Sequence, residues 1–447
     1  MTDTVLKHAS CLDDYDPASL PAGVALQKIL GALTPLADTE RVNLREALNC
    51  VLAEDIVSAI NVPSGTNSAM DGYALSSADI PAQGARELRL AGSAFAGRPY
   101  RGNLSPGECI RIMTGAILPA GADTVVMQEQ VELAGDMIRI DSTTEAGANV
   151  RQAGEDIAAG DKVLVRGHRL TPADIGLIAS LGIGEVAVTR RLRVAFFSTG
   201  DELRSVGETL TDGEIYDSNR YTLYGMLARL GTGIIDMGVI RDDREALENG
   251  FREAEARADV LITSGGVSVG EADYVKEILE NVGTINFWKV AMKPGRPLAF
   301  GRIGETWFFG LPGNPVSVMV TFYQFVQPAL RYLMGEPWND QTTFRVPCRS
   351  RLRKRPGRVE YQRGLLERDA TGQLVVTKTG AQGSGILRSM AQANCFIILP
   401  EDSGNVEPGT LVEVQPFFGL VRIGRKHFRN GMLFIDRRTS CDAPTCY

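Results

Sequence analysis

Apolar and polar residues alternate in blocks between residues 191 and 335, and these blocks predict strands and helices in turn. The short apolar runs typical of buried strands are LRVAFFST (192–199), GTGIIDMGVI (231–240), DVLIT (259–263) and WFFGLP (307–312). The expected helices are one that ends at Gly231, others near 243–257 and 273–281, and a long one from Pro315 to about Leu333, with Asn314 as its N-cap. This alternation predicts a parallel sheet covered by helices.

The rest of the chain has other patterns. Apolar residues at helical spacing around Ile29, and again around Leu48, predict two helices near the start of the chain. Short strand-like runs broken by Gly and Pro predict a β-rich insert at residues 61–149. Pro172 and Gly182 bound a further expected helix. Residues 340–420 return to short strands and turns, which favours a small β-barrel or sandwich.

Composition narrows the possible functions. The chain has 447 residues, enough for about three domains, and its net charge of −7 argues against a nucleic-acid coat. It contains no run of 18 apolar residues that would predict a membrane span, and its first residues do not resemble a secretory signal. Three histidines and seven cysteines without a Cys-x-x-Cys pair disfavour a multi-histidine metal centre, a zinc ribbon or a disulfide framework. We therefore expect a cytoplasmic protein whose chemistry rests on carboxylates, Lys, Arg and backbone amides.

Three glycine-rich loops follow three of the expected strands: STGDEL (198–203), TSGGVSVGEADY (263–274) and GLPGNPVS (310–317). Loops at the carboxyl ends of parallel strands line one crevice, and glycines let the backbone approach phosphate closely. The candidate phosphate-binding residues are Ser198, Thr199, Gly200, Ser264, Gly265, Gly266, Pro312, Gly313, Asn314 and Pro315. Each loop alone is equally compatible with a tight turn between a strand and a helix.

Two of these loops also carry carboxylates, Glu202 and Asp273. Mg²⁺ is commonly held by one or two carboxylates together with substrate phosphates, so these residues are candidate magnesium ligands. Asp273 could instead cap the helix expected to start near Tyr274.

Cations gather in the run FWKVAMKPGRP (287–297), where Lys289, Lys293 and Arg296 surround a Pro-Gly turn. Two cations beside one turn in an acidic chain favour an anion pocket, although surface lysines are usually only solvated. Arg363 and Ser384 add a further cation and a hydroxyl, and the hydroxyl could serve an oxyanion or merely a turn.

The β-rich insert contains the unusual text NSAMDGYAL (67–75), in which Asp71-Gly72 is also a common hairpin turn. Arg151, Glu155 and Asp156 cluster in RQAGEDI (151–157), which is readable as a turn with a salt bridge.

Taken together, these segments resemble the MoeA family of molybdopterin molybdenumtransferases, which includes the gephyrin E domain. The matching segments occur in family order over about residues 20–420: NSAMDGYA, CIRIMTGA, GEDI, SLGI, FSTGDEL, IYDSN, TSGGVSVGEADY, KPGRP, GLPGNPVS and QRG. Any one of these motifs would be weak evidence for the family, whereas the whole set in this order is close to diagnostic.

The resemblance implies an α/β multidomain fold and a homodimer. Its parts would be a connecting helical and β region at 20–60 and 150–190, an inserted β-rich lobe at 61–149, an adenylyltransferase-like three-layer α/β domain at 191–337 and a C-terminal β-barrel at 338–420. The active site would lie between the α/β domain of one subunit and the lobe of the other. The tail at 421–447 has no family counterpart, and we expect it to be a poorly ordered extension or an interaction segment.

The resemblance also implies the reaction: molybdate is inserted into adenylylated molybdopterin, with Mg²⁺ present, and AMP is released. The catalytic residues would be Asp71, Asp156, Glu202, Asp242 and Asp273, with Thr114 and Lys289 among the substrate-binding residues. Lys293, Arg296, Arg363 and Ser384 would bind molybdate, although Arg296 stands where many members have Lys. Expected partners are the molybdopterin adenylyltransferase and proteins that mature molybdoenzymes, with no nucleic acid and no membrane.

Two other functions fit part of the sequence. Residues 191–335 alone resemble the adenylyltransferase, but the lobe and the C-terminal region argue against that enzyme. A gephyrin-like scaffold for receptors or the cytoskeleton would depend on a fused adenylyltransferase domain, which these residues lack.

Overall fold

The computed structural model describes residues 19–266, 278, 283–338 and 341–417. Within them the chain forms two compact units, a larger one of residues 19–290 and 295–338 and a smaller one of 291–294 and 341–417. Among the described helices, none is both long and apolar enough to cross a membrane. The leader, the tail after residue 417 and most of the helix expected at 273–281 lie outside the described residues.

A six-stranded sheet forms the α/β part of the larger unit. Its strands, in spatial order, are β16 (Gly233–Ile240), β13 (Arg193–Thr199), β17 (Val260–Ser264), β21 (Thr306–Leu311), β20 (Pro297–Ile303) and β18 (Gly283–Lys289). The first four run parallel, β20 is antiparallel to β21, and β18 is antiparallel to β20, so only β20 runs against the other five strands. The expected α/β sheet is therefore present, but it is mixed, because β18, β20 and β21 follow one another through short connections that reverse the chain.

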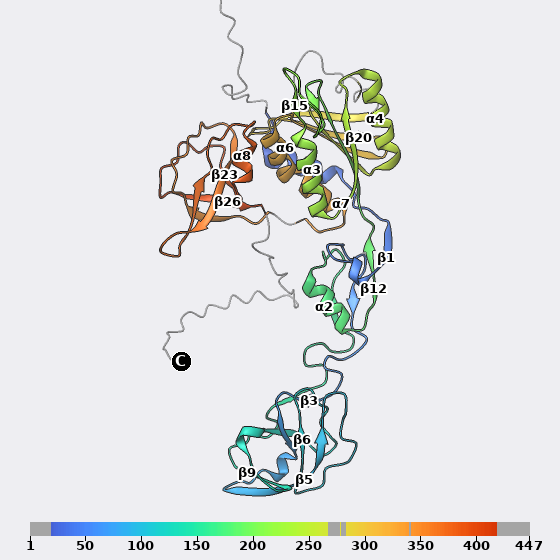
Figure 1. Ribbon diagram of the computed structural model, residues 1–447, viewed down its shortest axis with the longest axis vertical. Coiled ribbons are helices and arrows are strands. Elements are labelled where there is room, and N and C mark those ends of the chain that lie inside the picture. The colour runs from blue at the N-terminus through green and yellow to red at the C-terminus, as the bar shows by residue number, and fades with distance from the viewer. Residues whose placement is uncertain (1–18, 267–277, 279–282, 339–340, 418–447) are drawn as a thin grey trace, which may run out of the picture. The chain divides into compact units, whose positions relative to one another are not determined.

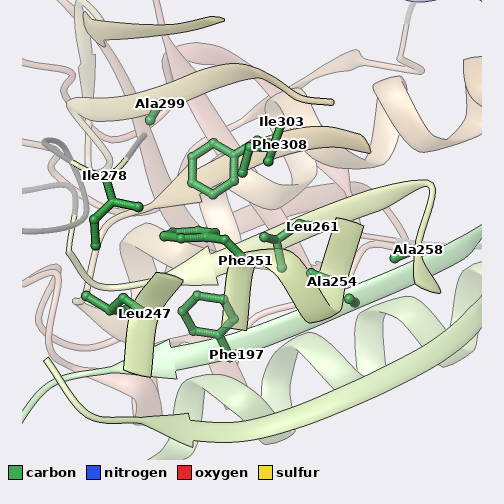
Figure 2. Packing of buried hydrophobic residues seen from close by; sticks show 11 residues of the cluster. Phe197, Leu247, Phe251, Ala254, Ala258, Leu261, Ile278, Ala299, Ile303 and Phe308 are labelled. Atoms are coloured by element: carbon green, nitrogen blue, oxygen red, sulfur yellow. The ribbon is translucent and has the colours of Figure 1, made fainter. Parts of the chain in front are cut away.

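Helices cover both faces of this sheet, with α4 (Arg244–Arg257) on one side and α3 (Ser218–Leu230) with α6 (Pro315–Thr321) on the other (Figure 1). On the α4 side, the ring of Phe251 packs edge-on against Phe197 and Phe308, with centroids 5.7 and 6.0 Å apart (Figure 2). Because successive strand residues point to opposite faces, Phe197 on the α4 side places Ser198 on the α3 side.

The helix ends follow the sequence signals with two exceptions. α3 begins after Asp217, whose side chain accepts the amide of Arg220, and ends at Gly231 with φ 74°. α2 (Pro172–Ser180) starts at the expected proline. The long helix expected from 315 is instead α6, a π-helical turn (Phe322–Val326) and α7 (Gln327–Leu333), because Pro328 lacks the amide and clashes with a regular helix. Asn314 has the backbone of an N-cap, but its side chain makes no capping bond.

The start of the larger unit contains one of the two helices expected there, α1 (Ala22–Ala32). The helix expected around Leu48 is wrong. The chain instead forms β1 (Thr39–Asn43), paired with β12 (Glu185–Thr189), and a short 3-10 turn. Leu44 and Leu52 are buried by an irregular segment in which Leu48 is exposed and Asn49 has a positive φ of 65°, which a helix cannot contain.

The insert is β-rich, as expected. Its strands, in spatial order, are β7 (Thr124–Met127), β4 (Gly72–Leu75), β6 (Glu108–Ile112), β5 (Ala85–Ala94), β9 (Met137–Asp141) and β8 (Glu132–Ala134). Two smaller pairs, β3 (Asn67–Ser68) with β10 (Val150–Arg151) and β2 (Ile56–Val57) with β11 (Lys162–Leu164), lie at or near its ends in sequence.

Asp71-Gly72 is not a hairpin turn, because β3 and β4 belong to different sheets. The glycine is required for another reason: a Cβ at Gly72 would lie 2.0 Å from the carbonyl oxygen of Val126 on the neighbouring strand.

The smaller unit is built on one sheet. Its strands, in spatial order, are β19 (Met292–Lys293), β23 (Val359–Arg368), β25 (Cys395–Leu399), β26 (Leu411–Pro416) and β22 (Phe344–Pro347), and β24 (Leu374–Lys378) also pairs with β23. Leu366 of β23 joins Cys395, Ile397 and Leu399 in an apolar core on one face. By alternation, Glu360 and Gln362 share that face of β23, whereas Tyr361 and Arg363 point to the opposite one.

Candidate functional site

The carboxyl ends of the parallel strands lie side by side. In the strand register, Ser198 is paired with Ser264, Ser264 is paired with Leu311, and Thr199 is paired with Ile240. The chain leaves all four strands at the same edge of the sheet, so the loops at 200–202, 265–266 and 312–315 meet there, as the sequence predicted.

Gly265 lets two of these loops approach each other. It has a φ of 94°, and a Cβ there would lie 2.5 Å from the carbonyl oxygen of Thr199. Its amide donates to the carbonyl oxygen of Leu311 over 3.1 Å. The next residue, Gly266, also has a positive φ of 66°. Any larger residue at 265 would push β13 and β17 apart at the point where both end.

Asn219 is not among the residues predicted for the site, yet it joins these loops. Asn219 lies in the first turn of α3, and its Nδ2 donates to Ser264 Oγ over 2.8 Å and to the carbonyl oxygen of Gly313 over 2.7 Å. The motif IYDSN contains Asn219, so the signal was present, but nothing in the sequence says which loops this side chain reaches.

Several buried polar atoms at this edge have no hydrogen-bond partner within the described part of the chain. They are Ser198 Oγ, Thr199 Oγ1, Thr263 Oγ1, Asp217 Oδ2 and Asn219 Oδ1. A buried polar group without a partner costs about 1–3 kcal/mol, so native proteins rarely keep several together. By alternation Thr199 and Thr263 lie on the α4 side, whereas Ser198 Oγ lies on the α3 side with Asn219 Oδ1, and these two atoms indicate a place for a polar ligand there.

Carboxylates accumulate at the ends of β13 and β16. The pKa of Asp242 is raised, first by burial and then by the negative charges of Asp201, Glu202 and Asp243. Such a cluster favours a cation or a proton. Among the described residues no group of three or more His, Cys, Asp or Glu side chains is arranged to hold a metal ion, and Asp273 lies outside those residues.

The remaining residues of the loop at 312–315 differ in exposure. Pro312 is buried, Gly313 and Asn314 are exposed, and Pro315 is half-buried at the first position of α6.

The cations around the Pro-Gly turn divide between the two units. In the larger unit, Lys289 is exposed at the end of β18, and the carbonyl oxygen of Arg296 accepts the amide of Val290 over 2.7 Å. In the smaller unit, Lys293 pairs in register with Glu360, and its Nζ lies 3.7 Å from Glu360 Oε1.

Arg363 is the largest fully buried side chain of the protein's described part. Its Nε donates to Ser389 Oγ over 3.1 Å and its terminal nitrogen to the carbonyl oxygen of Gly383 over 3.0 Å. Burial lowers the pKa of this guanidinium to about 10, so it stays charged at neutral pH. Within the described residues no carboxylate lies within ion-pair distance of it.

Half-buried Ser384 directly follows Gly383, whose carbonyl oxygen accepts from the guanidinium of Arg363. Lys293 does not join them, because residues paired in register share a face and Glu360 is on the face of β23 opposite Arg363. The structure therefore bonds Arg363 to the residue that precedes Ser384, but it does not bring Lys293 and Arg363 onto one face.

Asp71 lies in the insert, exposed just before β4. One of its carboxylate oxygens, Oδ1, accepts both the amide and the hydroxyl of Thr114, each over 2.7 Å. These two bonds, the backbone one first, hold the pKa of Asp71 below its usual value. Asp71 and Thr114 are thus brought together by the fold, as one anionic group in a fixed position.

Asp156 is also exposed, and its amide donates to the carbonyl oxygen of Val62 over 3.1 Å. Its neighbour Glu155 accepts the amide of Gln152 over 2.9 Å, which closes the turn expected here.

Comparison with protein families matches three parts of the chain. Residues 20–182 match the MoeA N-terminal region (domain I and II), residues 195–332 match a probable molybdopterin binding domain, and residues 345–417 match the MoeA C-terminal region (domain IV).

Individual relatives agree with this. The chain is 47% identical over 395 residues to a molybdopterin molybdenumtransferase from Haemophilus influenzae, covering 88% of this chain and 97% of that one. It is 38% identical over 372 residues to a molybdopterin molybdenumtransferase from a Nostoc species, covering 81% and 85%. A crystal structure of the molybdopterin biosynthesis MoeA protein from Pyrococcus horikoshii OT3 superposes with a TM-score of 0.78 at 30% identity, covering 89% of this chain and 100% of that one.

Proposed function

The chain belongs to the MoeA family, and on this premise we propose that it is a molybdopterin molybdenumtransferase, which inserts molybdate into adenylylated molybdopterin and releases AMP. The observation that carries the proposal is the set of unpartnered buried polar atoms, Ser198 Oγ among them, where the parallel strands end. Hydroxyl donors and backbone amides beside glycines suit the phosphoanhydride of an adenylylated substrate.

Mg²⁺ is the cation that we propose for the carboxylate cluster. Glu202 is the proposed ligand among the described residues, Asp273 is proposed as a second ligand from the sequence alone, and Asp242 adds a carboxylate that is electrostatically coupled to Glu202. The raised pKa of Asp242 supports this choice, because neighbouring negative charges make the cluster favourable for a divalent cation. When bound, Mg²⁺ neutralises charge on the phosphate oxygens as the anhydride breaks.

Molybdate is proposed to bind within the smaller unit, at Arg363 and Ser384 with Lys293, whereas Arg296 remains a proposed site residue from the family resemblance. Within the described residues, the buried guanidinium of Arg363 donates to the neutral oxygens of Ser389 and Gly383 and has no carboxylate as a counter-charge. A tetrahedral dianion would supply that charge and accept the remaining donors. Lys293 would have to leave Glu360 to take part, so we rank its contribution below that of Arg363.

We further propose a homodimer in which Asp71 and Thr114 act on the site of the partner subunit. The exposed, ionised Asp71 carboxylate is held in place by Thr114 and has one oxygen, Oδ2, outside these two bonds, which suits contact with a neighbouring molecule. Asp156 and Lys289 remain proposed site residues from the family resemblance. A cytoplasmic location and contacts with the adenylyltransferase and with maturation proteins are proposals of the same kind.

The test is a defined reaction of purified protein, adenylylated molybdopterin, Mg²⁺ and molybdate. We expect AMP release that depends on both ions. Consumption of ATP with molybdopterin, and no AMP from the adenylylated substrate, would favour the adenylyltransferase instead. Capture of protein partners without turnover would favour a scaffold.

A further inference from the structure

Asn219 connects three elements at the site with one side-chain amide. It lies on α3, it is 9% exposed, and its Nδ2 bonds both the end of β17 at Ser264 and the loop after β21 at Gly313. We propose that Asn219 is a positioning residue that turns hydrogen-bond donors, rather than acceptors, toward the anionic part of the substrate. This role rests on the proposed function.

The first consequence concerns the hydroxyl of Ser264. Its oxygen accepts the bond from Asn219 Nδ2, over 2.8 Å, and a hydroxyl has only one proton. That proton must point away from the amide, and the structure gives it no acceptor among the described residues. Asn219 therefore sets Ser264 as a donor, which is the polarity that a phosphate oxygen requires.

The second consequence concerns the peptide after Gly313. Its carbonyl oxygen is turned to Asn219 Nδ2, 2.7 Å away. In a trans peptide the carbonyl and the following amide point in opposite directions, so the amide of Asn314 points away from Asn219. Without Asn219 this carbonyl would lose its donor, and the peptide could turn an acceptor toward a ligand that already carries negative charge.

The place of Asn219 within the site is given by the atoms around it. Ser198 and Ser264 are paired in register, so both side chains lie on the α3 side of the sheet, where Asn219 bonds Ser264. Ser198 Oγ and Asn219 Oδ1 are both buried without a partner in the described chain. In a purely structural amide we expect both the nitrogen and the oxygen to be hydrogen-bonded. In Asn219 only Nδ2 is bonded, and its Oδ1 and the hydroxyl of Ser198 are both without a partner among the described residues.

The experiment compares steady-state AMP release by the wild type and by Asn219→Ala. We expect KM for adenylylated molybdopterin to rise about tenfold or more, with kcat within about threefold, because loss of a charge-assisted donor weakens binding of ground and transition states alike. Asn219→Asp keeps the shape but cannot donate, and it should raise KM as well. A folded variant of either kind with the wild-type KM overturns the proposal.

The matched control is Thr222→Val on the same helix. It removes the bond from Thr222 Oγ1 to the carbonyl oxygen of Ser218, 3.0 Å, and so weakens the first turns of α3 without touching the loops. KM should not change in this variant. An equal rise of KM in Thr222→Val and Asn219→Ala would mean that only helix stability matters and would overturn the proposal.

A double-mutant cycle tests whether Asn219 acts through Ser264. If it does, Asn219→Ala and Ser264→Ala together should raise KM little more than the stronger single variant. Full multiplication of the two effects would show independent roles and count against the proposal. A wild type that releases no AMP overturns the proposed function itself, whereas wild-type turnover with an unaffected Asn219→Ala overturns only the role of Asn219.

Discussion

Thr114 donates both its amide and its hydroxyl to one carboxylate oxygen of Asp71, each over 2.7 Å, and so fixes an exposed anion at the edge of the insert. These donors favour the charged carboxylate and lower its pKa. The structure thus keeps Asp71 ionised at neutral pH without burying it.

Thr114→Val should therefore raise the pKa of Asp71 toward its ordinary value, because the hydroxyl bond is lost and the amide bond remains. A carboxyl whose pKa is lowered in the folded state stabilises the fold at pH values above the ordinary carboxyl pKa. This contribution is lost as the pH falls through the lowered pKa. The variant should lose part of it. An NMR titration of the Asp71 carboxyl measures the shift, and an unchanged pKa would contradict the bond to the hydroxyl.

Glu202→Gln should reduce AMP release by about 10²-fold or more if Glu202 is a magnesium ligand, because it removes several kcal/mol of transition-state stabilisation. It should also lower the pKa of Asp242, since one of the charges that raises this pKa is gone. Excess Mg²⁺ should restore part of the rate. Glu245→Gln, an exposed carboxylate in the first turn of α4, is the control and should leave the rate unchanged.

Arg363→Lys should raise the molybdate concentration needed for half-maximal rate by about tenfold or more, because an ammonium cannot reproduce a fork of planar donors. KM for adenylylated molybdopterin should stay within about threefold. Ser384→Ala should act in the same direction, more weakly. If the two substrates were affected equally, Arg363 would hold phosphate rather than molybdate.

Mixing Asp71→Asn subunits with Glu202→Gln subunits tests the proposed dimer. If Asp71 serves the partner's site, a heterodimer has one doubly altered site and one intact site, so up to half of the wild-type activity per dimer should return. Subunit exchange is followed separately with tagged chains. A mixture that exchanges and stays inactive would mean that Asp71 serves its own subunit.

Phe251→Ala should lower the free energy of unfolding of the larger unit by about 3–5 kcal/mol, because the ring fills the space between Phe197 and Phe308 (Figure 2). Urea denaturation measures the loss. Leu133→Ala is the control, since that side chain is 56% exposed and should cost little.

Sequence patterns were sufficient where neighbours along the chain decide the outcome. The apolar runs before Ser198 and Ser264 are strands because they can be buried on both faces, and Gly231 ends α3 because it adopts a positive φ. The same patterns predicted a helix around Leu48 that does not form, because Val51 and Leu52 form β-bridges to Arg169 and Val188, which are far away in sequence.

Short-range patterns could not place side chains that meet across the fold. Lys293 and Arg363 are both cations near a proposed anion site, but strand register puts Lys293 beside Glu360 and alternation puts Arg363 on the other face of β23. The Gly at position 72 is explained by the backbone of Val126, which is 54 residues away along the chain, and not by a turn of its own.

The sequence by itself determined the four parallel strands, the helices α3, α4 and α6, the glycine-rich loops and the family, because those depend on composition and local spacing. Only the tertiary structure decided which polar atoms face one another. Tertiary contacts bond Asn219 to Ser264 and Gly313. They also bury Asp242 and place it where the negative charges of Asp201 and Glu202 raise its pKa further. Hydrogen bonds and charges act through space over a few ångströms, and the distance along the chain does not encode them.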